Sequence, residues 1–399
     1  MRLLYLTAEQ WPTFRADLTV LFGKYLPRHG ISSDLLTEHA LDKTEHSPWP
    51  AGNAQLCQVP KQRALQYFVK FLHQCRGLLT ANYPYYDAIQ VRDMTLIALV
   101  ALVLCKLKRK PFFYWLSYPQ SEGQIARAKA RGWRAGVRYW FPLLQGKVGQ
   151  LLLYRFILPS ADHVFVQSNN MLDALANKGV QLNKMTAVPM GVDMEAITIA
   201  PLPTDDVRLI GKRVMIYLGT LDRTRHIELL FSMLAQVQVQ IPNALLILAG
   251  DTEDAAHKAW LQDQAQALGV AEHIVWTHWL PMHEAWRYVV AAEVGLSPFP
   301  RDTLLDMASP TKAVEYMALG LPVVVNDNPD QQQVIQASGA GVCVALTAPA
   351  FAETVISLLN HPQQRVQMGQ LGKAYIAQQR SYQQIAQQLA DKYQQLLEH

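Results

Sequence analysis

The chain has 399 residues, half of them hydrophobic, so it is long enough for two domains with sizeable cores. Residues 1–200 carry 23 Lys and Arg against 13 Asp and Glu, whereas residues 201–399 carry 13 against 19, which predicts an anionic partner for the first half. The four cysteines are scattered, with no Cys-x-x-Cys and no metal-like spacing, which fits a reducing compartment.

The first half alternates short apolar runs with helical patterns. The N-terminal run is too brief for a signal peptide, and the longest apolar run, 96–105, is too short to span a membrane. Strands are expected at 3–6, 33–37, 88–91, 112–116, 163–167 and 185–188, with helices at 17–28, 95–108 and 170–178. Because strands that alternate with helices form parallel sheets, this pattern predicts an α/β domain.

A stretch at 194–207 with two prolines and little periodicity is the expected linker. A second series follows, with strands expected at 214–218, 245–249, 274–277, 294–296 and 323–325 and helices at 227–239, 255–268 and 283–290. We expect Rossmann-like domains at 1–196 and 205–375, and a C-terminal helix at 376–399 that could pack back on the first domain. Two such domains place a ligand cleft between them, at the carboxyl ends of both sheets.

The segment 308–328 combines a helix start, a helix, a stop and a buried strand. Ser309 is a candidate N-cap, and Pro310 occupies the expected first helical position. The free N–H groups and partial positive charge of a helix start, with Lys312 in the first turn, suit a diphosphate. Glu315 could accept hydrogen bonds from sugar or ribose hydroxyls. The alternative is a well-capped helix with a solvent-facing Glu.

The loop 219–225, GTLDRTR, directly follows the first expected strand of the second half. Arg223 and Arg225 could bind phosphate oxygens through forked, charge-assisted hydrogen bonds, unless the loop is simply solvated. Because this loop and the helix start at Ser309 should meet at the carboxyl edge of one sheet, the two features favour a common anion site.

Six blocks of the sequence resemble glycosyltransferase family 4 (glycosyl transferases group 1), in that family's order and spacing. The blocks are SADHVFVQSNNM at 160–171, VPMGVD at 188–193, YLGTLDRTR at 217–225, LLILAGD at 245–251, VGLSPFP at 294–300 and SPTKAVEYMALGLPVVV at 309–325. The resemblance covers nearly the whole chain. It implies the GT-B fold, in which two Rossmann-like domains face a central cleft, and a nucleotide-diphosphate sugar bound mainly to the second domain.

In that family a Glu-x7-Glu element spans the donor site. Its second Glu matches Glu315, which would bind the ribose, whereas its first falls at Met307, so this chain departs from the pattern. Asp306 is a candidate catalytic carboxylate, although it lies one residue before the position that the Glu-x7-Glu spacing requires. The resemblance implies that the diphosphate lies against the backbone around Pro310, Thr311 and Lys312.

The family's phosphate-binding Lys and Arg flank the first loop of the second domain. The Lys position matches Arg225 and the Arg position matches Thr220, so Arg223 would substitute for the missing Arg. Gly219 begins this loop and is included among the donor-binding residues. Trp279 lies where the family lines its base pocket, although a core or lid tryptophan fits the pattern equally well.

The first domain matches the family less closely. Arg15 lies after the first strand, near the usual position of a glycine pair, and could approach phosphate or simply begin the helix. The segment after the strand at 112–116 supplies Ser117 and Glu122 to the expected cleft but lacks the family's His. Asp93 is either the N-cap of the helix at 95–108 or an active-site acid, and we favour the cap.

No Asp-x-Asp occurs in the sequence and no His or Cys cluster has ligand spacing, so neither a metal nor another cofactor is implied. A helix N-terminus and arginines can neutralise a leaving diphosphate instead. The resemblance implies retention of anomeric configuration, and the residues identify no nucleophile or general base.

Residues 123–158 contain seven Lys and Arg, no acid, and interleaved aromatic side chains. No nucleic-acid recognition motif accompanies them, so nucleic-acid binding is not expected. The stretch predicts either a membrane-facing surface or a basic helical face packed on its own domain. With the basic residues at 106–110, the first interpretation implies a lipid-linked or membrane-presented acceptor.

We therefore predict a retaining glycosyltransferase that acts in the cytoplasm, as a peripheral protein of the inner membrane face, in surface polysaccharide biosynthesis. The first domain would select a lipid-linked or glycan acceptor, and the second would hold the nucleotide sugar. A sugar-nucleotide epimerase or a phosphorylase of similar fold would need a base or a lysine-bound cofactor, and neither is visible. A non-catalytic sugar-nucleotide-binding subunit stays open because the first Glu and the His are missing.

Overall fold

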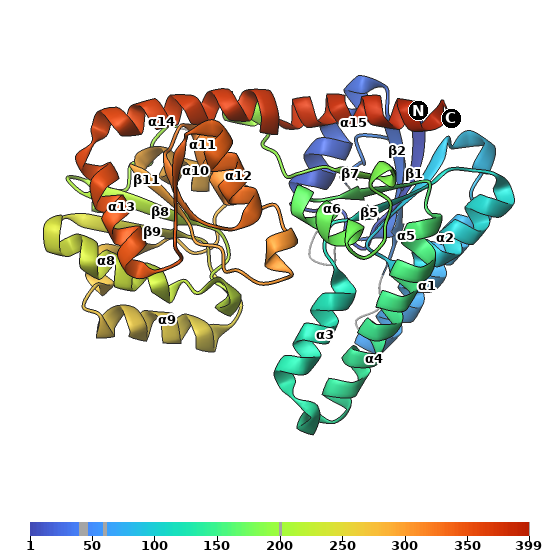
Figure 1. Cartoon of the computed structure of the whole chain (residues 1–399), viewed down its shortest axis with the longest axis horizontal. Coiled ribbons are helices and arrows are strands. Elements are labelled where there is room, and N and C mark those ends of the chain that lie inside the picture. Colours follow the sequence, from blue (N-terminus) through green and yellow to red (C-terminus); the bar gives the residue numbers. More distant parts are fainter. Residues whose placement is uncertain (40–46, 59–61, 199–201, 399) are drawn as a thin grey trace. The chain divides into compact units, whose positions relative to one another are not determined.

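The computed structural model describes residues 1–39, 47–58, 62–198 and 202–398, which form two compact units (Figure 1). The first unit comprises Met1–Pro189 with the C-terminal segment from Tyr382, and the second comprises Met190–Ser381. Each unit contains one parallel sheet with helices packed against it, which confirms the predicted α/β class. The division between the units precedes the stretch 194–207 that the sequence indicated as a linker.

The first unit contains a seven-stranded parallel sheet in the order β3-β2-β1-β4-β5-β6-β7. Its strands are β1 (Arg2–Leu6), β2 (Ser32–Glu38), β3 (Ala54–Cys57), β4 (Ala88–Arg92), β5 (Phe112–Leu116), β6 (His163–Val166) and β7 (Met185–Ala187). The predicted strands correspond to all of these except β3, a short edge strand without an apolar run. The strand order reverses between β1 and β4, and ligands of such sheets bind beyond the carboxyl ends of the strands at that point.

The helices of this unit include the π-helical segments η1 and η5. Their bounds are η1 (Asp17–Tyr25), α1 (Arg63–Thr80), α2 (Thr95–Lys108), α3 (Gln120–Arg131), α4 (Val137–Leu152), η5 (Leu153–Ile157), α5 (Leu158–Ser160) and α6 (Asn169–Ala176). Helices α3 and α4 pack against each other as a hairpin that extends away from the sheet (Figure 1). The basic, aromatic stretch 123–158 is therefore carried mostly by this hairpin.

The C-terminal helix α15 (Tyr382–Leu397) packs on the first unit. One face of the helix, including Leu389 and Tyr393, is buried in the core of the first unit. The Tyr393 hydroxyl donates a hydrogen bond to the side-chain oxygen of Gln90 at 2.5 Å. The predicted C-terminal segment is therefore divided, because its first turn, η11 (Ile376–Arg380), belongs to the second unit.

The second unit contains a six-stranded parallel sheet in the order β10-β9-β8-β11-β12-β13, which reverses between β8 and β11. Its strands are β8 (Arg213–Leu218), β9 (Ala244–Ala249), β10 (Ile274–Trp276), β11 (Val294–Ser297), β12 (Val323–Asn326) and β13 (Gly341–Val344). Both faces of this sheet are buried, since Met215 and Tyr217 enter one apolar core and Val214 and Ile216 enter the other. The sequence did not predict β13, a half-buried edge strand.

The helices of the second unit are α7 (Met194–Thr198), α8 (Glu228–Gln240), α9 (Ala255–Ala267), α10 (Met282–Ala291), α11 (Thr311–Leu319), α12 (Pro329–Ser338), α13 (Ala348–Asn360) and α14 (Pro362–Tyr375). They include those predicted, together with α7, α12 and α13, which the sequence analysis did not predict; α7 lies within the stretch expected as a linker. Across the described ranges of both units, no helix is long and apolar enough to cross a lipid bilayer. Within this unit, the ends of β8 and β9 and the start of α11 converge at one edge of the sheet.

Candidate functional site

The strongest candidate site lies at the carboxyl edge of the second sheet, where α11 begins. The hydroxyl of Tyr316 on α11 accepts a hydrogen bond from the backbone N–H of Leu218, the last residue of β8, at 2.7 Å. The Tyr316 ring also packs directly over Gly295 in β11, where any Cβ atom would come within 2.6 Å of the ring. These two contacts fix the helix against the end of the sheet.

Two glycines allow the loops after β8 and β9 to approach each other and the helix. Gly219 and Gly250 have φ angles of 128° and 148°, which L side chains rarely adopt. A Cβ atom at Gly250 would lie 2.1 Å from the carbonyl oxygen of Gly219, and a Cβ atom at Gly219 would lie 2.8 Å from Cε of Lys312. The Lys312 side chain therefore extends over a loop that only glycine can form.

A cavity of about 190 Å³ opens between these elements. It brings together five residues expected at a donor site, namely Gly219, Trp279, Thr311, Lys312 and Glu315. The apolar residues Leu280 and Met282 also line it, and the sequence analysis missed them. Their position directly after Trp279 was the available signal, because neighbouring residues of one loop tend to line the same pocket.

Arg225 lies close to this group. Its guanidinium stacks over the Phe299 ring at 4.5 Å, and its Nε and Nη1 atoms are buried without a hydrogen-bond partner. Arg223, in contrast, is exposed and pairs with Asp254 at 3.1 Å. Neither arginine lines the cavity itself, but the charge of Arg225 acts on Lys312, which does, whereas Arg223 is engaged by Asp254. The sequence analysis had predicted both as phosphate ligands, and the structure brings only Arg225 close to the group.

The charged groups of the cavity have unusual protonation equilibria. Burial, with the positive charge of Arg225, lowers the pKa of Lys312 to about 7. Burial raises the pKa of Glu315 to about 7, although the hydrogen bond with Thr311 and the charge of Lys312 oppose that shift. Both shifts disfavour the ionised forms because burial removes their hydration, and such perturbed pKa values are frequent at functional sites. A bound anion would favour the charged form of Lys312.

The start of α11 differs from the sequence prediction. Ser309 does not cap the helix, because its hydroxyl donates to Asp330 at 2.8 Å and accepts hydrogen bonds from the Met190 backbone N–H and from Arg380. Arg380 in turn pairs with Asp330 at 2.5 Å inside the second unit. Pro310 precedes the first helical residue, so α11 begins without any side-chain cap. The free N–H groups of its first turn are available to an anion.

Asp306 does not line this cavity. Its carboxylate accepts hydrogen bonds from Arg301 at 2.6 and 3.0 Å, and Arg301 also pairs with Asp327 at 2.8 Å. Met307, where the resemblance places the family's first Glu, is a buried apolar residue. Among the described residues, moreover, no three His, Cys, Asp or Glu side chains come together as possible ligands of a metal ion.

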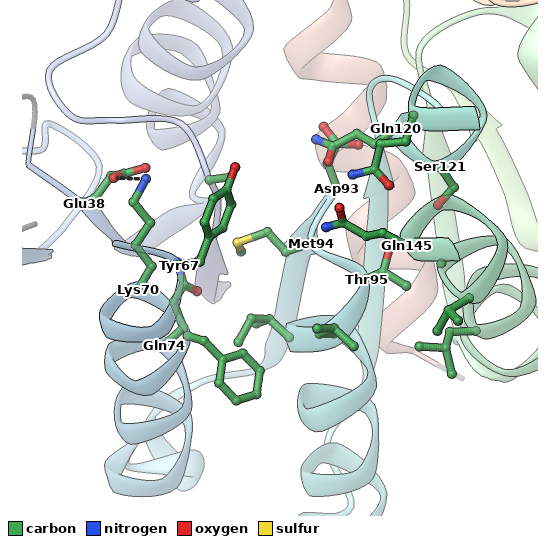
Figure 2. A pocket seen from close by; sticks show the side chains of 18 of the residues that line it. Glu38, Tyr67, Lys70, Gln74, Asp93, Met94, Thr95, Gln120, Ser121 and Gln145 are labelled. Atoms are coloured by element: carbon green, nitrogen blue, oxygen red, sulfur yellow. Dashed lines mark ion pairs between the residues drawn. The ribbon is translucent and has the colours of Figure 1, made fainter. Parts of the chain in front are cut away.

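A larger cavity, of about 760 Å³, lies at the carboxyl edge of the first sheet, and Asp93 lines it (Figure 2). Asp93 has a φ angle of 58° and does not cap α2, which begins after Met94 without a side-chain cap. Its carboxylate instead accepts hydrogen bonds from the backbone N–H and the hydroxyl of Ser117. Burial raises the pKa of Asp93, although Arg92 and Ser117 oppose the shift. The preferred interpretation of Asp93 as an N-cap was therefore wrong.

The other first-domain candidates lie outside this cavity and support local structure. Arg15 pairs with Glu9 at 3.1 Å and with Asp17 at 3.4 Å. Glu122 accepts hydrogen bonds from the Tyr154 hydroxyl and from Lys178. Burial alone would raise the pKa of Glu122, but these hydrogen bonds outweigh it and lower the pKa.

The first cavity also contains polar residues that the sequence analysis missed. They include Glu38, Lys70, His73, Gln74, Gln120, Gln124 and Gln145. Glu38 ends β2, so the rule that ligand residues follow strands could have found it. The glutamines lie on helices without a distinguishing pattern, so only the fold reveals them.

Two family models match adjacent parts of this chain. The model described as Glycosyltransferase Family 4 matches residues 18–196, and the model described as Glycosyl transferases group 1 matches residues 207–375. A curated relative from Mycolicibacterium smegmatis is the GDP-mannose-dependent alpha-(1-6)-phosphatidylinositol monomannoside mannosyltransferase. It is 28% identical over 195 residues, which are 47% of this chain and 50% of that protein. The chain thus matches about half the length of this relative.

Solved structures share the fold at low sequence identity. Sucrose-phosphate synthase from Thermosynechococcus elongatus superimposes with a TM-score of 0.73 and 19% identity, covering all of both chains. HepE from Anabaena, in complex with UDP and glucose, superimposes with a TM-score of 0.71 and 16% identity, covering 99% of this chain and 100% of that chain. With the two parallel sheets, these likenesses confirm the expected GT-B fold.

The raised pKa of Glu315 predicts a pH-dependent cost in stability. Between about 4.5 and 7 the folded protein retains a proton on Glu315 that the unfolded chain has released, so stability falls as the pH rises through this window. Glu315→Gln is neutral at every pH. It should raise the melting temperature by roughly 3 °C or more at pH 8 and leave it near the parent value at pH 5.

Thermal unfolding followed by circular dichroism at both pH values measures this difference. The matched control is Glu253→Gln, because Glu253 is exposed and lies outside the cavity. Equal effects of Glu315→Gln at pH 5 and pH 8 would contradict the assignment of a raised pKa.

Proposed function

We propose that this chain, which belongs to glycosyltransferase family 4 (glycosyl transferases group 1), is a retaining glycosyltransferase that uses a nucleotide-diphosphate sugar. The single observation that carries the donor assignment is the uncapped start of α11 beside Lys312 and the unpaired nitrogens of Arg225. Helix N-terminal amides and two cations together form a site for a diphosphate. The UDP and UDP-glucose complexes of the structurally similar HepE support this choice of ligand.

The remaining lining of the cavity suits the other parts of a nucleotide sugar. Glu315, one turn along α11, would accept hydrogen bonds from the ribose hydroxyls once it is ionised. Trp279, Leu280 and Met282 would contact the base on the opposite side. Trp279 is 56% exposed, so its ring is available to a ligand rather than committed to the core.

In the proposed reaction, the bond between the anomeric carbon and the diphosphate oxygen breaks and an acceptor hydroxyl forms the new bond on the same face. The negative charge that develops on the leaving diphosphate would be stabilised by the α11 amides, Lys312 and Arg225, without a metal or another cofactor. The acceptor proton leaves with the diphosphate or to solvent. Asp93, held by Ser117, is the candidate catalytic carboxyl group of the first unit. Asp306 is the weaker candidate because Arg301 already pairs with it.

A non-catalytic sugar-nucleotide-binding subunit is the second candidate function. The observation that favours it is Met307, a buried apolar residue at the position where the resemblance places a Glu near the sugar. Such a protein would bind the nucleotide through the same groups on α11. It would neither transfer the sugar nor hydrolyse the donor.

We further propose a lipid-linked or glycan acceptor, and action at the cytoplasmic face of the membrane in surface polysaccharide biosynthesis. The name of the mycobacterial relative, which includes a phosphatidylinositol mannoside, supports a lipid-linked acceptor. On the α3–α4 hairpin, Trp133, Trp140 and Phe141 are each at least 60% exposed among basic residues. Exposed aromatic and basic side chains on one element suit an anionic membrane surface.

Nucleotide binding tests the donor site. Among UDP, GDP, dTDP, ADP and CMP, one diphosphate at a hundred times its dissociation constant should stabilise the protein by about 2.7 kcal/mol. Arg225→Met and Glu315→Ala should each abolish most of this stabilisation, because they remove a phosphate ligand and a ribose ligand. The measurement is the shift of the melting temperature.

Arg223→Met provides the matched control, since Arg223 lies two residues away in the same loop but is exposed and pairs with Asp254 instead of acting on Lys312. It should retain the full shift. If Arg223→Met lost the shift and Arg225→Met kept it, the site would be misassigned, and no shift with any nucleotide would count against the donor proposal itself.

Vesicle binding tests the membrane surface. Replacing the exposed Arg134 and Arg138 by Gln should weaken partitioning onto phosphatidylglycerol-containing vesicles about 30-fold, since each charge contributes about 1 kcal/mol near an anionic surface. Co-sedimentation measures the partition coefficient. The control, Lys212→Gln with Arg223→Gln, removes two exposed charges from the second unit and should have little effect. Equal losses in both double variants would show that the attraction is not specific to the hairpin.

A further inference from the structure

The large cavity of the first unit combines a sheet edge with helical walls. Ala8 follows β1, Thr37 and Glu38 end β2, and Asp93 and Met94 follow β4, so the cavity lies at the reversal point of this sheet. Helices α1, α2, α3 and α4 supply the remaining walls. Its volume of about 760 Å³ is within the usual range of small-molecule pockets.

Polar side chains gather at one end of this cavity. Figure 2 shows Asp93, Thr95, Gln120 and Gln145 together beyond β4, and the Glu38–Lys70 ion pair on the opposite wall. Lys70 lies 2.5 Å from Glu38, so its charge is already neutralised. Among the described lining residues, the polar end therefore offers amide, hydroxyl and carboxyl groups, which recognise hydroxyls, and the lysine it contains is already paired.

The rest of the cavity is lined by hydrocarbon. In Figure 2 side chains that carry only carbon lie further along the helices than the labelled polar group. The apolar lining residues are Phe71, Leu96, Ile97, Phe141, Val148 and Leu152. An apolar space of this size that stays open to water is costly, and a hydrocarbon ligand would remove that cost.

Apolar side chains also cover the outside of the same helices. The exposed ones include Phe68 and Leu72 on α1, Val103 and Leu107 on α2, and Leu144 and Leu151 on α4. The α3–α4 hairpin beside them carries six Lys and Arg and no acid between residues 123 and 152. This charge complements an anionic bilayer, from which a lipid could enter the cavity.

We propose that this cavity binds the hydrocarbon chain of a lipid-linked sugar, with the sugar at the polar end beside Asp93 and the chain along α1, α2 and α4. The role of this lipid as the glycosyl acceptor rests on the proposed function. The binding of the lipid to the cavity does not depend on that function. The proposal selects the lipid-linked acceptor over a free glycan. It also assigns the glutamines Gln120 and Gln145 to recognition of the acceptor's hydroxyls.

Alkyl maltosides, which join a neutral sugar to a chain of chosen length, test this proposal without any nucleotide. Hexyl, octyl and decyl maltoside are titrated into the full chain by calorimetry, each below its micelle-forming concentration. The dissociation constant should fall about fourfold for each added methylene, while maltose alone should not bind detectably. Decyl phosphocholine, which has the same chain but a zwitterionic head, should bind at least tenfold more weakly than decyl maltoside.

Two substitutions that fill the cavity separate it from the exposed apolar surface. Val148→Trp on α4 and Leu96→Trp on α2 change cavity-lining positions that are 45% and 58% exposed, so the indole covers the hydrocarbon part of the cavity, and each should abolish the dependence on chain length. Val137→Trp is the matched control, because Val137 lies on α4, is 80% exposed and does not line the cavity. It should bind like the parent, and circular dichroism establishes that each variant is folded.

Three results would overturn the proposal: no dependence on chain length in the parent, equal binding of decyl phosphocholine, or parent-like binding by both folded cavity-filling variants. The last would place the detergent on the exposed surface instead. Because no nucleotide is present, this outcome is independent of the donor site. If the protein bound a nucleotide but no maltoside, only the lipid-binding proposal would be contradicted. If it bound maltoside but no nucleotide, only the donor assignment would be contradicted.

Discussion

The proposed donor site depends on Ser309 and on the buried ion pair between Arg380 and Asp330. A serine before a helix ordinarily caps it, but here its hydroxyl is hydrogen-bonded to Asp330 and Arg380. The first amides of α11 therefore have no side-chain partner and remain open to a ligand. Because Arg380 also donates a hydrogen bond to the Met190 carbonyl, the same ion pair connects the two ends of the second unit with the start of α11.

The charged groups around the start of α11 are poorly compensated in the protein without a ligand. Lys312 and Glu315 both have pKa values shifted by burial toward neutrality, and Arg225 leaves two nitrogens unpaired. Each of these costs stability in the absence of a ligand. A diphosphate beside the cations and ribose hydroxyls beside Glu315 would remove these costs together. The same uncompensated groups therefore destabilise the free site and account for its proposed specificity. In the first unit, likewise, the open cavity exposes apolar side chains to water, and a bound hydrocarbon chain would remove that cost.

Sequence patterns predicted the parts of this architecture that depend on local periodicity. The buried strands and their flanking helices were found because apolar runs and helix stops are local signals, and glycine loops after strands indicated the ligand edge. The patterns failed where partners are distant in the sequence. Ser309 was expected to cap α11 and Asp93 to cap α2, but residues on other elements bind both side chains. The separation of Arg223 from Arg225 also depends on a distant residue, since Phe299 holds only the second.

The central claim is that the α11 site holds a nucleotide sugar and stabilises its leaving diphosphate. The most direct measurement is ¹H NMR of the full chain incubated with candidate nucleotide sugars and no acceptor, compared with Arg225→Met. The account predicts that one donor is slowly hydrolysed, that the anomeric configuration is retained in the first sugar released, and that Arg225→Met is about a hundredfold slower. Release with inverted configuration, or no hydrolysis of any donor by the folded parent, would contradict it.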